Sequence, residues 1–162
     1  MNTKVNCSGC SACAAVCPKE CIKIEYNGDG FLRSFTDEAE CIQCGLCEHV
    51  CPMEYAKSSA LDDGVLYAAW GDIENRKQSS SGGIATRLAS YAVSHGYEVC
   101  GAVLDYDTLH VKHILVNKET DLDVLRGSKY LQSNVVSAFR EILKELRSSS
   151  EKKYFWYALS NS

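Results

Sequence analysis

The chain has 162 residues, of which 17 are basic and 21 acidic, so its formal net charge is −4. It contains no basic stripe with interleaved aromatic residues, and we therefore expect no nucleic-acid partner. The first residues lack an apolar signal core, and no run approaches the ~18 apolar residues that a membrane span needs. These features predict a cytoplasmic chain without a membrane span.

Cysteine is distributed unevenly along the chain. Nine of the ten cysteines lie between Cys7 and Cys51, whereas the remainder of the chain holds only Cys100. A segment of ~50 residues buries too little apolar surface to fold securely by itself, so disulfides or metal must stabilise it. Thiols stay reduced in the cytosol and are available there as metal ligands. We therefore expect residues 1–57 to form a domain that a metal cofactor stabilises.

This first domain contains an internal repeat of the motif C-x2-C-x2-C-x3-C-P. The second copy begins 34 residues after the first, at Cys41 instead of Cys7. In the bacterial ferredoxin arrangement, the fourth cysteine of each copy binds the cluster of the other copy. The repeat therefore predicts two [4Fe-4S] clusters that carry electrons one at a time. The first would be bound by Cys7, Cys10, Cys13 and Cys51, and the second by Cys17, Cys41, Cys44 and Cys47.

The third and fourth cysteines of each copy favour clusters over zinc. Zinc also takes four thiolates, but zinc sites use pairs of C-x2-C and leave those further cysteines without a role. Small residues in the loops, including Gly9 and Gly45, would let backbone N–H groups approach the cluster and tune its potential. Cys21 and Cys100 lie outside the eight, and we interpret both as core or loop thiols rather than ligands.

A β-hairpin is predicted between the two motif copies. Ile22–Tyr26 alternates apolar and polar residues, and Asn27–Gly30 supplies turn residues before a second run at Phe31–Phe35. Further along, residues 58–64 are mostly small, polar or acidic and have no periodicity. We interpret them as a linker to a second domain at residues 65–162.

The second domain is predicted to begin with a strand at Val65–Gly71. The serine- and glycine-rich segment Gln78–Gly83 is typical of a loop that leads into a helix. That helix should span Ile84–His95, because apolar residues such as Leu88 and Tyr91 recur on one face at helical spacing.

Two strands, a helix and a last strand are predicted next. Glu98–Asp105 and Leu109–Val116 read as neighbouring strands, and Leu131–Leu146 has the amphipathic pattern of a helix of about four turns. Lys153–Leu159 predicts the last strand. The expected fold class is α+β, with a bacterial ferredoxin-like dicluster domain followed by a small α/β domain. Because such a layer rarely ends on a strand, we expect a missing continuation.

Three further segments resemble a known family. They are Ser79–Ile84 (S-S-S-G-G-I), Gly101–Val103, and Leu125–Ser133 (L-R-G-S-K-Y-L-Q-S). Together with the two ferredoxin motifs, they resemble the beta subunit of coenzyme F-420 hydrogenases and dehydrogenases. The resemblance implies an oxidoreductase subunit in which FAD exchanges electrons with the clusters and a hydride with coenzyme F-420. It also implies a redox partner protein or further oxidoreductase subunits.

The matched segments contain the candidate flavin-binding residues. Glycines ahead of Ile84 would let backbone donors approach a phosphate where the helix begins. Lys129 would supply a point charge to the flavin or its phosphates. The alternative is that serine and glycine form only a helix cap and a turn, and that G-S-K-Y is only a tight loop. The candidates are Ser81, Gly82, Gly83, Gly127, Ser128 and Lys129.

The end of the chain departs from the family pattern. Similar proteins continue from an apolar strand into a T-P-C-Q turn and a large C-terminal domain, whereas this chain has Phe155–Ser160 and ends at Ser162. The absent residues would complete much of the flavin and deazaflavin pocket. The rival hypothesis is therefore a ferredoxin-type electron-transfer module, or a truncated fragment, with no active site of its own.

Overall fold

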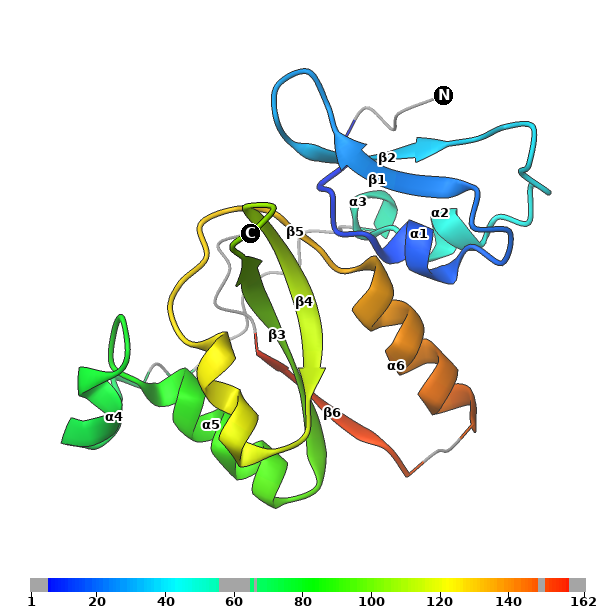
Figure 1. Ribbon diagram of the computed structural model, residues 1–162. Coiled ribbons are helices and arrows are strands. Elements are labelled where there is room, and N and C mark those ends of the chain that lie inside the picture. The colour runs from blue at the N-terminus through cyan, green and yellow to red at the C-terminus, as the bar shows by residue number, and fades with distance from the viewer. Residues whose placement is uncertain (1–5, 56–64, 66, 149–150, 158–162) are drawn as a thin grey trace.

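The computed structural model describes residues 6–55, 65, 67–148 and 151–157. We call residues 6–55 the cysteine-rich module and the described residues from 67 to 157 the sheet module (Figure 1). Both contain helices and strands, which confirms the α+β class. Within the described ranges, every helix is too short or too polar to cross a lipid bilayer. The linker expected at residues 58–64 lies outside these ranges.

The cysteine-rich module consists of a β-hairpin and three short helices. Strand β1 (Ile22–Tyr26) pairs antiparallel with β2 (Leu32–Thr36), so the predicted hairpin is confirmed, with its second strand one residue later than expected. The side chain of Asn27 closes the turn, because its Oδ1 accepts the N–H groups of Asp29 (3.1 Å) and Phe31 (2.9 Å). The helices are α1 (Ala12–Val16), α2 (Leu46–His49) and α3 (Pro52–Tyr55).

The sheet module is built on four strands in the order β5-β4-β3-β6. The inner strands β3 (Tyr97–Asp105) and β4 (His110–Val116) are neighbours, as the sequence predicts, and they run antiparallel. Strand β6 (Lys153–Tyr157) runs parallel to β3, and the two-residue β5 (Ser133–Asn134) runs parallel to β4. The sheet is therefore mixed. Residues 158–159 of the predicted last strand lie outside the described residues.

Helices cover both faces of this sheet. Helix α5 (Ile84–Ser94) and the 3-10 helix η1 (Glu119–Leu125) lie on one face, and α6 (Val136–Ser148) lies on the other (Figure 1). Alternation along β3 supplies both cores. Val99 packs with the α5 side, and the neighbouring Cys100 packs with the α6 side.

The strand predicted at Val65–Gly71 is wrong. The described residues of that segment form no strand, and the side chains of Val65, Tyr67 and Trp70 are exposed. The places beside the inner strands are taken by β5 and β6, and the described residues of this segment pair with neither edge of the sheet. A short helix that the sequence did not predict, α4 (Ile73–Lys77), follows it.

The helix predicted at Ile84–His95 is confirmed and ends one residue earlier, but the predicted face is only partly right: it included Ala92 together with Leu88 and Tyr91. Leu88 is 49% exposed and Tyr91 is 64% exposed, whereas Ala89 and Ala92 are buried against the sheet. Small side chains let the helix backbone approach the sheet closely, and the larger apolar residues then lie on the outer side. Periodicity identified the helix but only part of its inner face.

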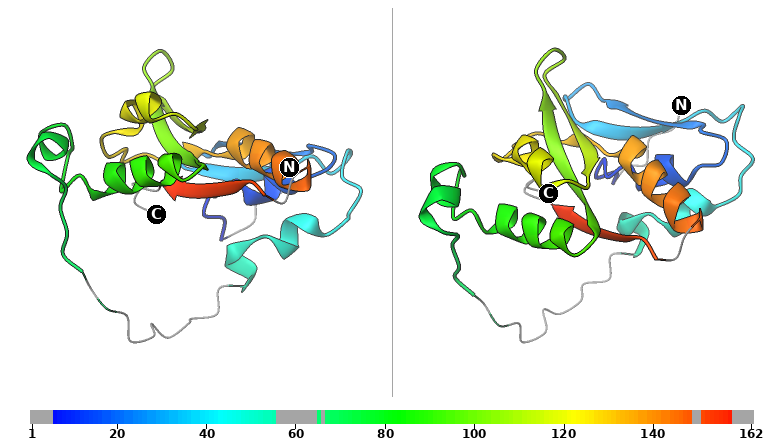
Figure 2. Two further views of the ribbon diagram at one scale, coloured as in Figure 1. Left: turned by 90° about the horizontal axis from the view of Figure 1, so that it is seen from below. Right: turned by 60° about the horizontal axis from the view of Figure 1, so that its bottom comes forward.

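Helix α6 begins later than expected and joins the two modules. It starts at Val136 rather than Leu131, because the strand β5 occupies the residues just before it. Figure 2 shows α6 between the sheet and the cysteine-rich module. Arg140 of α6 pairs with Glu20 (2.9 Å) and donates to the carbonyl of Ala14 in α1 (3.1 Å). The modules are thus held in contact by charge-assisted hydrogen bonds.

Candidate functional site

Two cavities in the cysteine-rich module divide the eight motif cysteines. The first cavity, of about 280 Å³, is lined by three motif cysteines of the first copy and one of the second. The second cavity, of about 640 Å³, is lined by one motif cysteine of the first copy and three of the second. The structure therefore brings together the same two groups of four that the sequence predicts. The first cavity has Cys7, Cys10, Cys13 and Cys51 on its wall, and the second has Cys17, Cys41, Cys44 and Cys47.

The repeat extends to the backbone of the two cysteine loops. Gly9 and Gln43, 34 residues apart, both have left-handed φ values, of 74° and 54°. In each loop this turns the N–H group back onto a cysteine: Gly9 N lies 3.3 Å from Cys7 Sγ, and Gln43 N lies 3.4 Å from Cys41 Sγ. Each cavity thus has a backbone donor aimed at one of its sulfurs, where it stabilises negative charge.

Hydrogen bonds also act on the acidity of two thiols. Burial by itself raises the pKa of Cys7, but donation from the Ser34 hydroxyl and the Gly9 N–H outweighs it, and the pKa is lowered overall. The pKa of Cys17 is likewise lowered against the effect of burial, chiefly by its contact with the Cys21 thiol. Both shifts act in favour of the thiolate, the form that binds metal.

The donor set fits iron-sulfur cubes better than single ions. In the described part of the chain, no three His, Cys, Asp or Glu side chains converge on one point as a single metal ion requires. The four thiolates of a cube spread more widely, because each binds a different iron. A tetrahedral zinc site would instead draw four sulfurs to about 2.3 Å from one atom. The first cavity is lined by the four motif thiols expected for one cube, and the second by the other four together with Cys21.

Gln132 connects the first cavity to the sheet module. Its Oε1 accepts the N–H of Leu32 (2.7 Å), and its Nε2 donates to the carbonyl of Ser8 (3.0 Å). Ser8 lies between two cysteines of the first cavity. The first cavity is therefore tied directly to the segment that precedes β5 in the sheet module.

A third cavity, of about 330 Å³, opens at the N-terminal end of α5. It is formed by the serine- and glycine-rich loop and by the turn after η1, which Ser80 and Ser128 connect through their hydroxyls (3.3 Å). Gly83 has φ 75° and caps α5, and an added Cβ would lie 3.0 Å from the Asn75 side chain. The candidates on this cavity are Ser81, Gly82, Gly83, Gly127 and Ser128.

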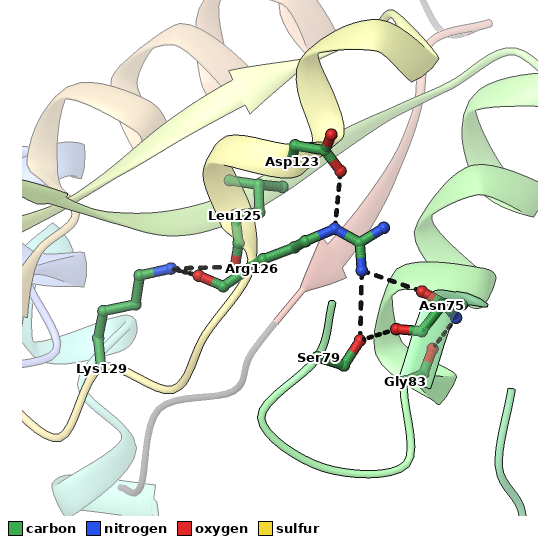
Figure 3. A network of polar contacts seen from close by, with 7 residues as sticks. All are labelled: Asn75, Ser79, Gly83, Asp123, Leu125, Arg126 and Lys129. Carbon is green, nitrogen blue, oxygen red and sulfur yellow. Dashed lines mark hydrogen bonds and ion pairs between the residues drawn. The ribbon is translucent and has the colours of Figure 1, made fainter. Parts of the chain in front are cut away.

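The last candidate, Lys129, does not line this cavity. Its Nζ donates to the carbonyls of Leu125 (3.0 Å) and Arg126 (2.7 Å), at the end of η1 (Figure 3). Burial lowers the pKa of this amine. In this conformation the ammonium group therefore donates hydrogen bonds to backbone carbonyls and does not face the cavity.

Arg126 is the cation on the cavity wall, and sequence reasoning missed it. Its guanidinium contacts Asp123 (2.7 Å), Asn75 (3.0 Å) and Ser79 (3.2 Å), so one side chain joins η1 to α4 and to the serine loop (Figure 3). The arginine stood in the motif that carried the family resemblance. Only its contacts across about 50 residues of sequence distinguish it from Lys129.

Two family models match consecutive parts of the chain. Residues 6–66 match the family model of a 4Fe-4S dicluster domain, and residues 65–140 match that of the coenzyme F420 hydrogenase/dehydrogenase beta subunit, N-terminal part. A search of curated proteins finds no relative of the chain. The two matches support 4Fe-4S clusters and an iron-sulfur electron-transfer role. Together the two matches extend over residues 6–140 and bear out the resemblance that the sequence motifs indicated.

Proposed function

We propose that the chain is an electron-transfer subunit whose two [4Fe-4S] clusters exchange electrons with a flavin or coenzyme F-420 held at the third cavity. One observation carries the proposal: eight motif cysteines divide into four around each of two cavities. Four thiolates are the ligand set of one cube. The proposed ligands are Cys7, Cys10, Cys13 and Cys51 for the first cluster, and Cys17, Cys41, Cys44 and Cys47 for the second.

The protein's own part in electron transfer is electrostatic. When bound, each cluster accepts and releases one electron at a time, so the site must tolerate an additional negative charge. The N–H groups of Gly9 and Gln43 point at cysteine sulfurs and favour that charge. Donors of this kind raise the reduction potential relative to the same ligands without them.

The third cavity would hold the phosphates of a flavin or deazaflavin. The N-terminus of the 11-residue helix α5 opens on it, and Gly82 and Gly83 leave the backbone there accessible to an anion. Arg126 on the same wall offers a planar cation that suits phosphate. Gln132 ties the first cavity to the segment that follows Arg126, so the first cluster would be the one that serves this pocket.

FAD binding under anaerobic conditions tests the flavin part. The iron-loaded chain should take up FAD, measured by quenching of flavin fluorescence. Arg126→Gln should weaken the affinity at least about tenfold, because a charged hydrogen bond contributes about 1.5–3 kcal/mol. Arg87→Gln removes a charge from α5 at a residue that does not line the cavity, and it is the matched control. An iron-loaded wild-type chain that takes up no FAD would contradict this part of the proposal.

A second candidate function is an electron carrier without an active site of its own. It is favoured by the size of the third cavity, which lies near the lower end of the range of about 300–1,000 Å³ for small-ligand pockets. A whole dinucleotide would extend well beyond it. In that case dithionite reduces the clusters, yet no hydride passes to or from FAD or coenzyme F-420. The redox partner would then bind the cysteine-rich module directly.

A further inference from the structure

The second cavity contains a cysteine that the repeat does not account for. Cys21 lies on its wall together with the four motif cysteines of that cavity, and it is 6% exposed. Its sulfur is 3.4 Å from the sulfur of Cys17. The side chain of Cys41, from the other motif copy, also contacts it. Cys21 is thus placed among the predicted ligands rather than at the margin of the cavity.

Local structure explains why the two thiols meet. The chain turns tightly after α1, where the N–H of Glu20 bonds to the carbonyl of Cys17 (3.2 Å) and Glu20 has a left-handed φ of 52°. Cys21 is then fixed at the start of the hairpin, since its carbonyl accepts the N–H of Asp37 (2.8 Å). Its side chain packs in the small core with Ala14. The turn and the hairpin therefore bring both sulfurs to one corner of the cavity.

The first cavity has no such additional thiol. Among the described residues that line it, the cysteines are only the four motif members. In the repeat, position 21 corresponds to position 55, which is a tyrosine. Cys17 and Cys51 are therefore equivalent ligands by sequence, but only Cys17 has a neighbouring thiol.

We propose that Cys21 is an alternate ligand for the second cluster, able to occupy the corner otherwise bound by Cys17. This inference rests on the proposed assignment of Cys17 as a cluster ligand. In the exchange, the iron–sulfur bond to Cys17 breaks and a bond to the Cys21 sulfur forms. The Cys21 thiol releases its proton as it binds iron, and the departing Cys17 thiolate takes one up. No electron is gained or lost.

The two cysteines differ in their exposure to solvent, and this difference gives a reason for the exchange. Cys17 is partly exposed and also lines an outer groove of about 490 Å³ beside α6, so it is open to reagents from solvent. Cys21, whose sulfur contacts that of Cys17, is buried and does not line this groove. A buried thiol one contact away would keep the cube complete when the outer sulfur is oxidised or alkylated.

Alanine variants at the two equivalent ligands test the inference. Alanine is preferable to serine because it cannot bind iron through an oxygen. The anaerobically purified wild type should contain about eight irons, four for each cube. Cys17→Ala should retain about eight, whereas the matched control Cys51→Ala should fall to about four. Cys21→Ala should keep about eight, and the double variant Cys17→Ala/Cys21→Ala should fall to about four.

A spectroscopic measurement accompanies the iron count. After reduction by dithionite, paramagnetic resonance of Cys17→Ala should contain the signals of two interacting clusters, with an altered line shape because one ligand has changed. The double variant and Cys51→Ala should each have the signal of one isolated cluster.

Each alternative result is decisive. If Cys17→Ala holds about four irons or none, Cys21 does not replace the lost ligand and the inference is overturned. If Cys21→Ala is the variant that falls to about four, Cys21 is the resident ligand and the assignment is overturned in the other direction. A wild-type chain without iron would refute the proposed function itself, a result that the variants cannot mimic.

Discussion

At the scale of single residues, a loop position can require glycine for its left-handed backbone or for lack of space around a side chain. Comparison of Gly9 with Gln43 shows which of the two applies. Both adopt left-handed backbone conformations at the same position of the repeat, so that conformation does not by itself demand glycine. Gly9 is buried, and an added Cβ would lie 2.4 Å from the carbonyl oxygen of Leu32 and 3.0 Å from the Gln132 amide. Close packing against the hairpin and the sheet module therefore excludes a side chain at Gly9.

Gly9→Ala should destabilise the chain and loosen the first cluster. The left-handed conformation costs an alanine about 1–2 kcal/mol, and the backbone contact with Leu32 must also yield. The thermal midpoint of the iron-loaded protein should fall by several degrees, measured anaerobically by cluster absorbance. Gly28→Ala is the control, because nothing lies within 4 Å of its added Cβ. Equal thermal midpoints for Gly9→Ala and Gly28→Ala would contradict the close packing of Gly9 against the carbonyl of Leu32.

At the scale of secondary-structure elements, the junction of the modules combines the apolar packing of Val136 against the cysteine-rich module with a few polar contacts. Arg140 of α6 bonds to α1, and Gln132 bonds both to β2 and to the loop of the first cavity. The latter pair of bonds spans 100 and 124 residues of sequence. Side chains from distant parts of the sequence therefore help to position the sheet module relative to the first cavity.

Gln132→Ala should release this contact. Each lost hydrogen bond removes about 1 kcal/mol, and the buried amide of Leu32 loses its acceptor. Hydrogen exchange at Leu32 should accelerate at least about fivefold, as should the loss of iron from the first cluster to a chelator. Gln78→Ala, at the end of α4, is the control. Unchanged exchange at Leu32 in the Gln132 variant would mean that the modules hold their positions without this side chain.

At the scale of the whole molecule, the two modules are stabilised by different means. Among the described residues of the cysteine-rich module, five apolar residues are buried, and three of them, Ala14, Cys21 and Ile22, form a small cluster. The sheet module has separate apolar clusters on both faces of its sheet. Because the binding energy of a metal site is also folding energy, the first module should depend on iron and the second should not.

Removal of iron tests this division. An anaerobic chelator should abolish hydrogen-exchange protection across the hairpin of the cysteine-rich module, while β3 and β4 stay protected. The measurement is exchange mass spectrometry of the iron-loaded and stripped chains under one buffer. Simultaneous loss of protection in β3 would instead make the chain a single cooperative unit.

Much of the fold and of the metal site could be predicted because the responsible signals are local. Regular spacing marks the cysteine loops, alternation marks the hairpin, and helical periodicity marks α5. Predictions failed where the outcome depends on competition between distant segments. Val65–Gly71 has a strand-like composition, yet β5 and β6 already occupy the places beside the inner strands.

The sequence by itself determined which eight cysteines belong to the repeat and how they are expected to divide between two clusters. Only the tertiary structure decided that Arg126 rather than Lys129 lies on the third cavity, and that Cys21 joins the second. The physical reason is the range of the interactions. Motif spacing is fixed by the geometry of a few adjacent residues, whereas a cavity wall is assembled from segments that meet only after the chain has folded.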